Sequence, residues 1–239
     1  MTDTSALEGS VPPTGPPPNL SSAIGILGGT FNPPHCGHLA LARHAKTELG
    51  LDRVLLMPAN SAPHKGEQED PGPERRLEMC RLAVGEELGL EACALEVERG
   101  GPSYTVDTLR AIKQSNPRAE LTFIVGSDMA RTLPAWREPR ALVELAGLAV
   151  AEREDAGREE VLRALAPLGA RVTFLAMGML EVSSSQVRER VKAGEPIEGL
   201  VAPAVAEYIA AHALYSGALA DTKANMQGQT RTRAKAGAK

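Results

Sequence analysis

The sequence predicts a single α/β domain built on a parallel β-sheet with helices on both faces. From residue 22 to residue 216, short apolar runs alternate with longer segments of helical periodicity. Strands that are joined by helices of this length pair in parallel, and both faces of such a sheet are covered. The 239 residues, 43% of them hydrophobic, are enough for one such core.

The elements follow one another in a regular order. The first strand is predicted at residues 23–27, and the helix that follows continues to residue 50. A polar loop is predicted at 59–73. Further strands are predicted at 53–57, 92–97, 121–125, 148–151 and 171–175. Further helices are predicted at 74–88, 104–114, 158–165, 185–192 and 204–212, with a short one ending at 145.

Both ends of the chain differ from this pattern. Residues 1–21 form a Pro-rich leader, and residues 217–239 form a basic tail without apolar periodicity. We predict that both are disordered, because neither offers enough apolar surface to fold. A basic tail is compatible with nucleic-acid binding, but the net charge of −4 favours solubility as its role. We therefore expect no nucleic-acid partner.

The motif that organises the chain directly follows the first strand. It reads Gly28-Gly29-Thr30-Phe31-Asn32-Pro33-Pro34-His35-Cys36-Gly37-His38. His35 and His38 are three residues apart at a helix start, where N–H groups and imidazole donors favour phosphate. No third metal ligand is evident, so we predict no metal held by protein side chains. Gly37 indicates a close approach to the backbone. The structural alternative is a capped helix with two structural histidines.

A second motif lies about 150 residues later. It reads Val182-Ser183-Ser184-Ser185-Gln186-Val187-Arg188. Serines at a helix start cap it and present hydroxyls to a phosphate, and Arg188 lies one turn further, within reach of the same anion. Taken alone, this motif is explained equally well by a capped surface helix.

Together the two motifs resemble the signatures of the nucleotidylyltransferase superfamily. The detailed form is similar to that of the nicotinate-nucleotide adenylyltransferases. The resemblance implies a doubly wound, Rossmann-like fold and transfer of an adenylyl group from ATP to nicotinate mononucleotide, with Mg²⁺ bridging the ATP phosphates. Two positions depart from the pattern: Asn32 replaces the usual Asp, and Ser185 replaces the usual Thr.

The resemblance implies a set of ATP-binding residues. His35, His38 and Arg188 are the expected catalytic residues, with His38 on the α-phosphate and the other two on the outgoing phosphates. A Pro63-His64-Lys65 stretch in the polar loop and a Gly126-Ser127-Asp128 turn also resemble family segments. The expected ATP-binding residues are Gly28, Gly29, Thr30, Phe31, His35, His38, His64, Lys65, Gly126, Asp128, Ser184, Ser185 and Arg188. For Asp128, a helix cap is the structural alternative.

The acceptor site is expected at two further segments. By resemblance, Ser103, Tyr104 and Thr105 lie beside the nicotinate carboxylate and Trp136 stacks on the pyridine ring. Arg137 stands where relatives often have an aromatic residue, and its charge would attract the carboxylate. Ser103 or Thr105 is also a candidate helix cap. A lone Trp is more often part of a core, which is the alternative for Trp136.

The remaining features concern the location of the protein, its oligomeric state and the alternative functions. Three cysteines in no paired motif indicate reduced thiols and a cytoplasmic protein, and no apolar run is long enough for a membrane span. The sequence leaves a homo-oligomer open. Alternative functions are adenylyl transfer to nicotinamide mononucleotide or phosphopantetheine, and a module that binds ATP without turnover.

Overall fold

The computed structural model describes residues 22–61, 69–152, 157–176 and 182–216, and it confirms the predicted α/β architecture. The strands form a six-stranded sheet in the order β3-β2-β1-β4-β5-β6, with every neighbouring pair parallel. The strands are β1 (Ala23–Gly29), β2 (Arg53–Pro58), β3 (Leu90–Ala92), β4 (Glu120–Gly126), β5 (Ala146–Ala151) and β6 (Val172–Leu175).

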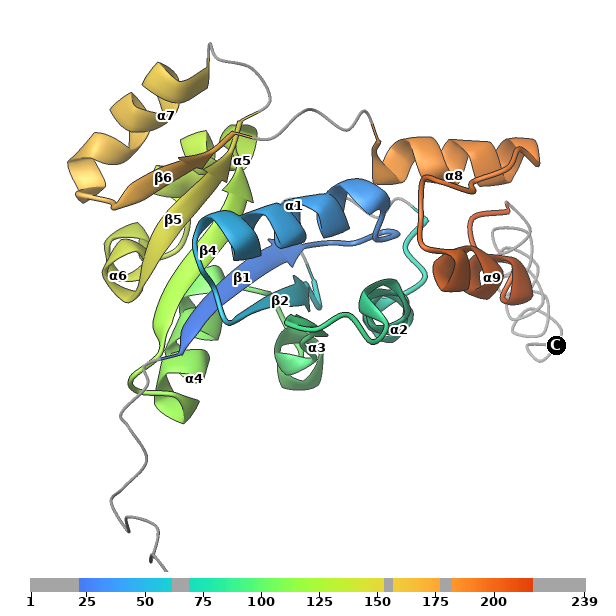
Figure 1. Ribbon diagram of the computed structural model, residues 1–239, viewed down its shortest axis with the longest axis horizontal. Coiled ribbons are helices and arrows are strands. Elements are labelled where there is room, and N and C mark those ends of the chain that lie inside the picture. The colour runs from blue at the N-terminus through green and yellow to red at the C-terminus, as the bar shows by residue number, and fades with distance from the viewer. Residues whose placement is uncertain (1–21, 62–68, 153–156, 177–181, 217–239) are drawn as a thin grey trace, which may run out of the picture.

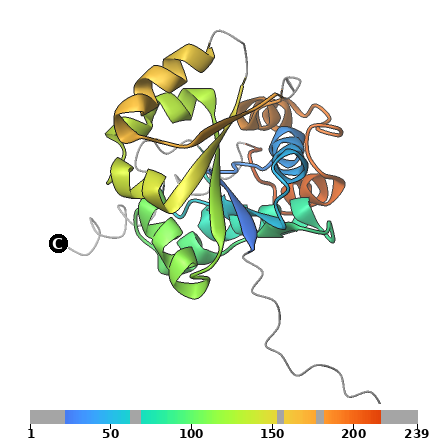
Figure 2. The ribbon, with the colours of Figure 1, turned by 60° about the vertical axis from the view of Figure 1, so that its left-hand side comes forward.

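Helices cover both faces of this sheet, so the fold is doubly wound (Figures 1 and 2). One face carries α1 (Cys36–Glu48) and α2 (Pro73–Val84). α8 (Ser184–Ala193) and α9 (Pro203–Ala211) share the same hydrophobic cluster and lie beyond the strand ends, with α9 against α2 (Figure 1). The other face carries α4 (Thr105–Ser115), α5 (Ser127–Thr132), α6 (Pro139–Leu145) and α7 (Arg158–Leu165). Shorter elements are α3 (Leu95–Arg99) and the 3₁₀ turns η1 (Leu133–Ala135) and η3 (Ala166–Leu168).

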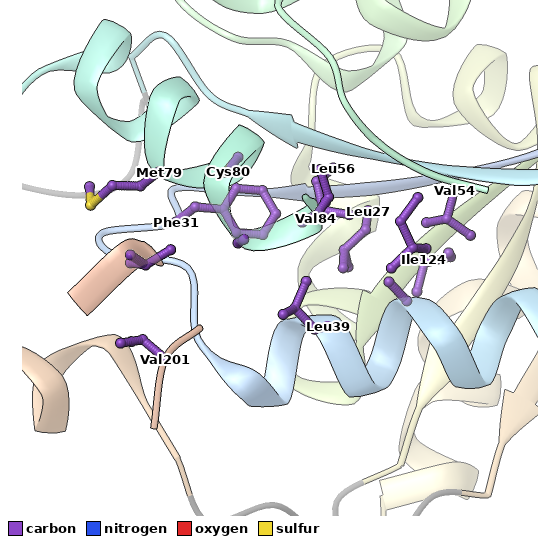
Figure 3. Close-up of a cluster of buried hydrophobic side chains, with 14 of the residues drawn as sticks. Leu27, Phe31, Leu39, Val54, Leu56, Met79, Cys80, Val84, Ile124 and Val201 are labelled. Carbon is purple, nitrogen blue, oxygen red and sulfur yellow. The ribbon is translucent and has the colours of Figure 1, made fainter. Parts of the chain in front are cut away.

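The central strands are apolar along their whole length because both of their faces are buried. On β2, for example, Leu56 packs against the side of α1 and α2, whereas Leu55 packs toward α4. In Figure 3, Leu39 of α1 points toward the sheet near Leu27, and the ring of Phe31 lies beside Cys80 of α2. The turn that follows β1 is therefore anchored in the core as firmly as the strand itself.

The strand order reverses between β1 and β4. β1 pairs with β2 on one side and with β4 on the other, and the two crossovers leave toward opposite faces of the sheet. At such a switch point the loops after the strands diverge, which opens a crevice beyond their carboxyl ends. The two strands end at Gly29 and Gly126, so both glycine corners border this crevice.

One predicted element is wrong. Residues 92–97 were expected to form a strand, but β3 ends at Ala92 and α3 begins at Leu95. The alternation in Glu-Ala-Cys-Ala-Leu-Glu-Val resembles a half-buried strand. However, β3 is an edge strand that pairs only with β2, while Ala, Leu and Glu favour helix. Beyond the last residue of β3 that pairs with β2, the helix propensity of these residues therefore determines their conformation.

Smaller differences concern boundaries. The helix expected at 74–88 ends at Val84, because Gly85 adopts a positive φ of 52°. α5 and η1, which directly follow β4, were not predicted. The leader 1–21, the tail 217–239 and residues 62–68 of the polar loop lie outside the described residues. Within the described part of the chain, no helix has both the length and the apolar character that a membrane span requires.

Candidate active site

A cleft of about 2060 Å³ lies beyond the carboxyl ends of β1 and β4. Every predicted site residue within the described segments lines it, although they come from distant parts of the chain. His64 and Lys65 fall outside the described residues. The lining includes Gly28, Gly29, Thr30, Phe31, His35, His38, Ser103, Tyr104, Thr105, Gly126, Asp128, Trp136, Arg137, Ser184, Ser185 and Arg188.

The ring of His38 is fixed by three contacts. It stacks on His35 with 3.6 Å between ring centroids, and it makes a T-shaped contact with Phe31 at a centroid distance of 4.8 Å. Phe31 adopts a positive φ of 51°, an uncommon conformation that is held by its buried ring. The His38 Nδ1 accepts a hydrogen bond from the His35 backbone N–H at 3.2 Å. In the neutral ring the proton therefore lies on Nε2, which leaves Nε2–H as the donor.

Two groups at the start of α1 contact other parts of the protein. N–H groups at this helix start were expected to favour phosphate, but the N–H of Cys36 donates to the carbonyl of Leu200 at 2.8 Å. Gly37 was expected to allow a close approach to the backbone, and Val182 and His35 make that approach. A Cβ at this position would lie 3.0 Å from Val182 Cγ1 and 3.1 Å from His35 Nδ1. The glycine accommodates the protein's own side chains, so the imidazoles carry more of any phosphate binding here.

The second motif contacts the first directly. Ser183 caps α8 as predicted, because its hydroxyl accepts the N–H of Gln186 at 3.1 Å. Ser184 Oγ donates to the Pro33 carbonyl at 2.8 Å. Arg188 donates from Nη1 to the Asn32 carbonyl at 2.8 Å and from Nη2 to Ser185 Oγ at 3.2 Å. Figure 1 shows α8 beside the N-terminal end of α1. The two motifs thus form one wall of the cleft.

A second group of predicted residues lies at the start of α4 and directly after η1. Trp136 is half-buried, its Nε1–H donates to Thr132 Oγ1 at 3.0 Å, and its ring lies edge-on to Phe123 at 6.0 Å. The Arg137 guanidinium lies over the Tyr104 ring at 4.7 Å. Trp136 both packs against the core and lines the cleft, so the two interpretations of this residue are compatible.

Two expected caps are not observed. Tyr104, not Ser103 or Thr105, is the N-cap residue of α4, and no side chain caps that helix. Ser103 Oγ instead accepts the Asn60 N–H at 2.9 Å, which ties this segment to the end of β2. Asp128 lies in the first turn of α5 and pairs with Arg131 at 2.6 Å, while Gly126 is the N-cap. A carboxylate in a first turn still favours the helix through its dipole.

Arg76 was not predicted, although it lines the cleft. Its side chain is 1% exposed. The guanidinium donates to the carbonyls of Thr30 at 2.8 Å, Ala59 at 2.7 Å and Asn60 at 3.1 Å. It also forms an ion pair with Asp70 at 2.8 Å. Arg76 thereby fastens the ends of β1 and β2 together and places a buried positive charge behind the cleft.

A buried pair behind the start of α4 was also missed. Thr108 Oγ1 donates to Glu96 Oε1 at 2.6 Å, and both residues line the cleft. Arg99 donates to the same Thr108 oxygen at 3.2 Å. Glu96 lies in α3, where the sequence had indicated a strand, so its inward direction could not be predicted.

The cleft offers no ready-made cage for a metal ion. Among residues 22–61, 69–152, 157–176 and 182–216, no group of three or more His, Cys, Asp or Glu side chains is arranged to hold one.

Comparisons with known proteins agree with this geometry. A family model described as cytidylyltransferase-like matches residues 26–190. A probable nicotinate-nucleotide adenylyltransferase of Synechococcus sp. (strain JA-3-3Ab) is 42% identical over 84% of this chain and 98% of its own. One of Roseiflexus sp. (strain RS-1) is 41% identical over 82% of this chain and 98% of its own.

Solved structures support the fold. A Plasmodium falciparum nicotinic acid mononucleotide adenylyltransferase, complexed with NaAD, has a TM-score of 0.66 at 20% identity. The match covers 81% of this chain and 97% of that one. At this identity the likeness concerns the fold alone.

The sheet order, the joined motifs and the family model together define a nucleotidyltransferase of the doubly wound class. The chain belongs to the cytidylyltransferase-like family and, within it, groups with the nicotinate-nucleotide adenylyltransferases. The resemblance identified in the sequence is thereby confirmed.

Proposed function

We propose that this protein transfers the adenylyl group of MgATP to the 5′-phosphate of nicotinate mononucleotide, which yields nicotinate adenine dinucleotide and pyrophosphate. The observation that carries the proposal is a single cleft with phosphate donors at one wall and an aromatic and cationic group at another. The curated relatives at about 40% identity bear the corresponding name.

The reaction needs no nucleophile from the protein. An oxygen of the acceptor phosphate, ionised near neutral pH, attacks the α-phosphorus, and the bond from that phosphorus to the bridging oxygen breaks. Catalysis then depends on positioning and on stabilising charge. Mg²⁺ carried by ATP neutralises part of the triphosphate charge. The Nε2–H donor of His38, held in place by Phe31 and His35, suits the α-phosphate.

The outgoing phosphates are assigned to His35 and Arg188. Arg188 is held to the Asn32 carbonyl, and a guanidinium is well suited to bind two phosphate oxygens at once. Ser184 and Ser185 lie in the first turn of α8, beside the same wall. The buried charge of Arg76 adds to the local attraction for anions, although the whole chain carries −4.

The acceptor, nicotinate mononucleotide, is assigned to the group of residues around Trp136 and Arg137. Trp136 offers a ring that Thr132 and Phe123 hold in place, and Arg137 offers a cation directed by the Tyr104 ring. Ser103, Tyr104 and Thr105 supply the adjoining wall. A charged hydrogen bond to the nicotinate carboxylate contributes ~1.5–3 kcal/mol, so the acid is favoured roughly 10- to 150-fold over the amide. The unpaired cysteine thiols support action in the cytoplasm.

Pyrophosphate release tests the proposal directly. The wild-type protein is given MgATP with nicotinate mononucleotide or with nicotinamide mononucleotide. Strong preference for the acid is expected. Equal rates would discard the carboxylate pocket but keep the adenylyl transfer. No release with either acceptor would point to phosphopantetheine as acceptor or to ATP binding without turnover.

His38→Ala tests the role of the phosphate donor. We expect turnover to fall ~10²–10³-fold, the typical loss for one such donor, with little change in acceptor KM. His44→Ala is the matched control, because His44 lies on the same helix and pairs with Glu48 away from the cleft lining. Unchanged turnover in His38→Ala would refute the assignment.

A further inference from the structure

Tyr215 lies far from both motifs in sequence but contacts the first one. It follows the end of α9, and its side chain is buried, with 4% exposure. Its hydroxyl donates to Asn32 Oδ1 at 2.7 Å across a separation of 183 residues. Tyr215 itself adopts a positive φ of 62°. An L-residue persists in that conformation only where its surroundings hold it.

Asn32 connects this tyrosine to the phosphate wall. It is 8% exposed, and its backbone carbonyl accepts Arg188 Nη1 at 2.8 Å. The next carbonyl, that of Pro33, accepts Ser184 Oγ at 2.8 Å. The turn therefore binds Tyr215 through the Asn32 side chain, and it binds Arg188 and Ser184 of α8 through its backbone carbonyls.

The hydroxyl of Tyr215 is suited to a permanent donor role. Burial raises its pKa well above the ordinary value, so it stays protonated throughout the physiological range. Loss of this donor would remove a buried hydrogen bond from the Asn32 side chain, which is costly enough for the turn to adjust around it. Because the backbone carbonyl of the same residue accepts Arg188, a shift of the turn would also move the point at which Arg188 is held.

We propose that Tyr215 is a positioning residue for Arg188, acting through Asn32, so that the segment after α9 is part of the phosphate-binding machinery. This inference rests on the proposed contact between Arg188 and the outgoing phosphates. It assigns Tyr215 no contact with substrate. It predicts a defect confined to ATP, because the aromatic and cationic group around Trp136 lies on other elements.

Tyr215→Phe removes one oxygen and keeps the buried ring. We expect kcat/KM for ATP to fall roughly 5- to 30-fold, the range for one buried hydrogen bond of this kind, with acceptor KM unchanged. Tyr208→Phe is the matched control: Tyr208 lies on α9, outside the cleft lining, with its ring against His212. The control should retain wild-type constants.

A double-mutant cycle distinguishes positioning from general destabilisation. In an Arg188→Ala background, Tyr215→Phe should change kcat/KM for ATP by less than about 2-fold, since its effect runs through the missing side chain. An equal loss in both backgrounds, a rise in the acceptor KM as large as that in the KM for ATP, or no loss in the single variant would overturn the inference. If Tyr215→Phe does not fold, Asn32→Ala tests the same connection from its other end, with the same expected pattern.

Arg188→Ala alone separates this inference from the proposed function. If that variant is as active as the wild type, the assignment of Arg188 to the phosphates is wrong, and the role of Tyr215 falls with it. If Arg188→Ala is impaired but Tyr215→Phe is additive with it, the proposed function stands and only the present inference is overturned.

Discussion

Replacing Arg76 by Met should destabilise the protein more than any exposed arginine would. Met matches the apolar stem of arginine but removes the charge and every donor. Three carbonyls at the ends of β1 and β2 lose their partner, and Asp70 loses its ion pair. Because the Asp70 side chain is 36% exposed, water can solvate it, and the cost falls on the carbonyls. A buried acceptor without its donor costs ~1–3 kcal/mol, so we expect ~3–5 kcal/mol for the three carbonyls together, which is a large part of a typical unfolding free energy of ~5–15 kcal/mol.

The loss should be visible in both chemical and thermal unfolding. For a chain of this size each kcal/mol lowers Tm by ~2–4 °C, so we expect Tm to fall by about 6–20 °C. Urea denaturation without nucleotides gives the free energy itself, because bound ligand would mask the change. Arg81→Met is the matched control, since Arg81 is an exposed residue of the same helix and pairs only with Glu78 among the ion pairs found.

Arg81→Met should remain within ~0.5 kcal/mol of the wild type, as surface substitutions usually do. An Arg76→Met protein with a loss below ~1 kcal/mol would refute the reasoning. It would mean that water entering from the cleft replaces the guanidinium almost fully, so that the strand ends do not depend on it.

Three further outcomes are expected. Trp136→Ala should raise the acceptor KM while ATP binding stays nearly unchanged, because the ring belongs to the acceptor group; equal loss for both substrates in steady-state kinetics would contradict this. Burial raises the pKa of the Cys80 thiol to about 12, so Cys80 should resist thiol reagents at ~pH 8 until the protein unfolds. Because the unfolded thiol ionises first, near pH 9, its contribution to stability is lost as pH rises from about 9 toward 12, and Cys80→Ala should flatten that decline in urea titrations.

The strand–helix alternation and the two motifs could be predicted because their signals are local. A glycine turn after an apolar run, paired histidines and a serine cap each depend on residues close in sequence. Arg76 could not be predicted, because Arg75-Arg76 within a polar helix resembles a solvated face. Its burial depends on carbonyls from two strand ends that only the folded sheet brings near.

Polar groups with two competing partners account for the other differences. Ser103 was a candidate cap of α4, but its hydroxyl accepts the backbone N–H of Asn60. N–H groups at the start of α1 were expected to favour phosphate, but that of Cys36 donates to the Leu200 carbonyl. In both cases the partner comes from a segment distant in sequence, so the local pattern identified the polar group correctly and its partner wrongly.

The contacts of the Asn32–Pro33 turn have a consequence for how activity arises as the chain is made. The hydrogen-bond partners of this turn are Ser184, Arg188 and Tyr215, which lie 151, 156 and 183 residues further along the chain. Contacts of such long range form late and slow the folding of a domain. During synthesis, an emerging chain displays both histidines long before it possesses the groups that would hold a triphosphate beside them. If Arg188 and Tyr215 have the roles proposed above, catalytic competence comes only once the segment that follows α9 has been made, and a chain cut short before it carries the histidine motif without these groups.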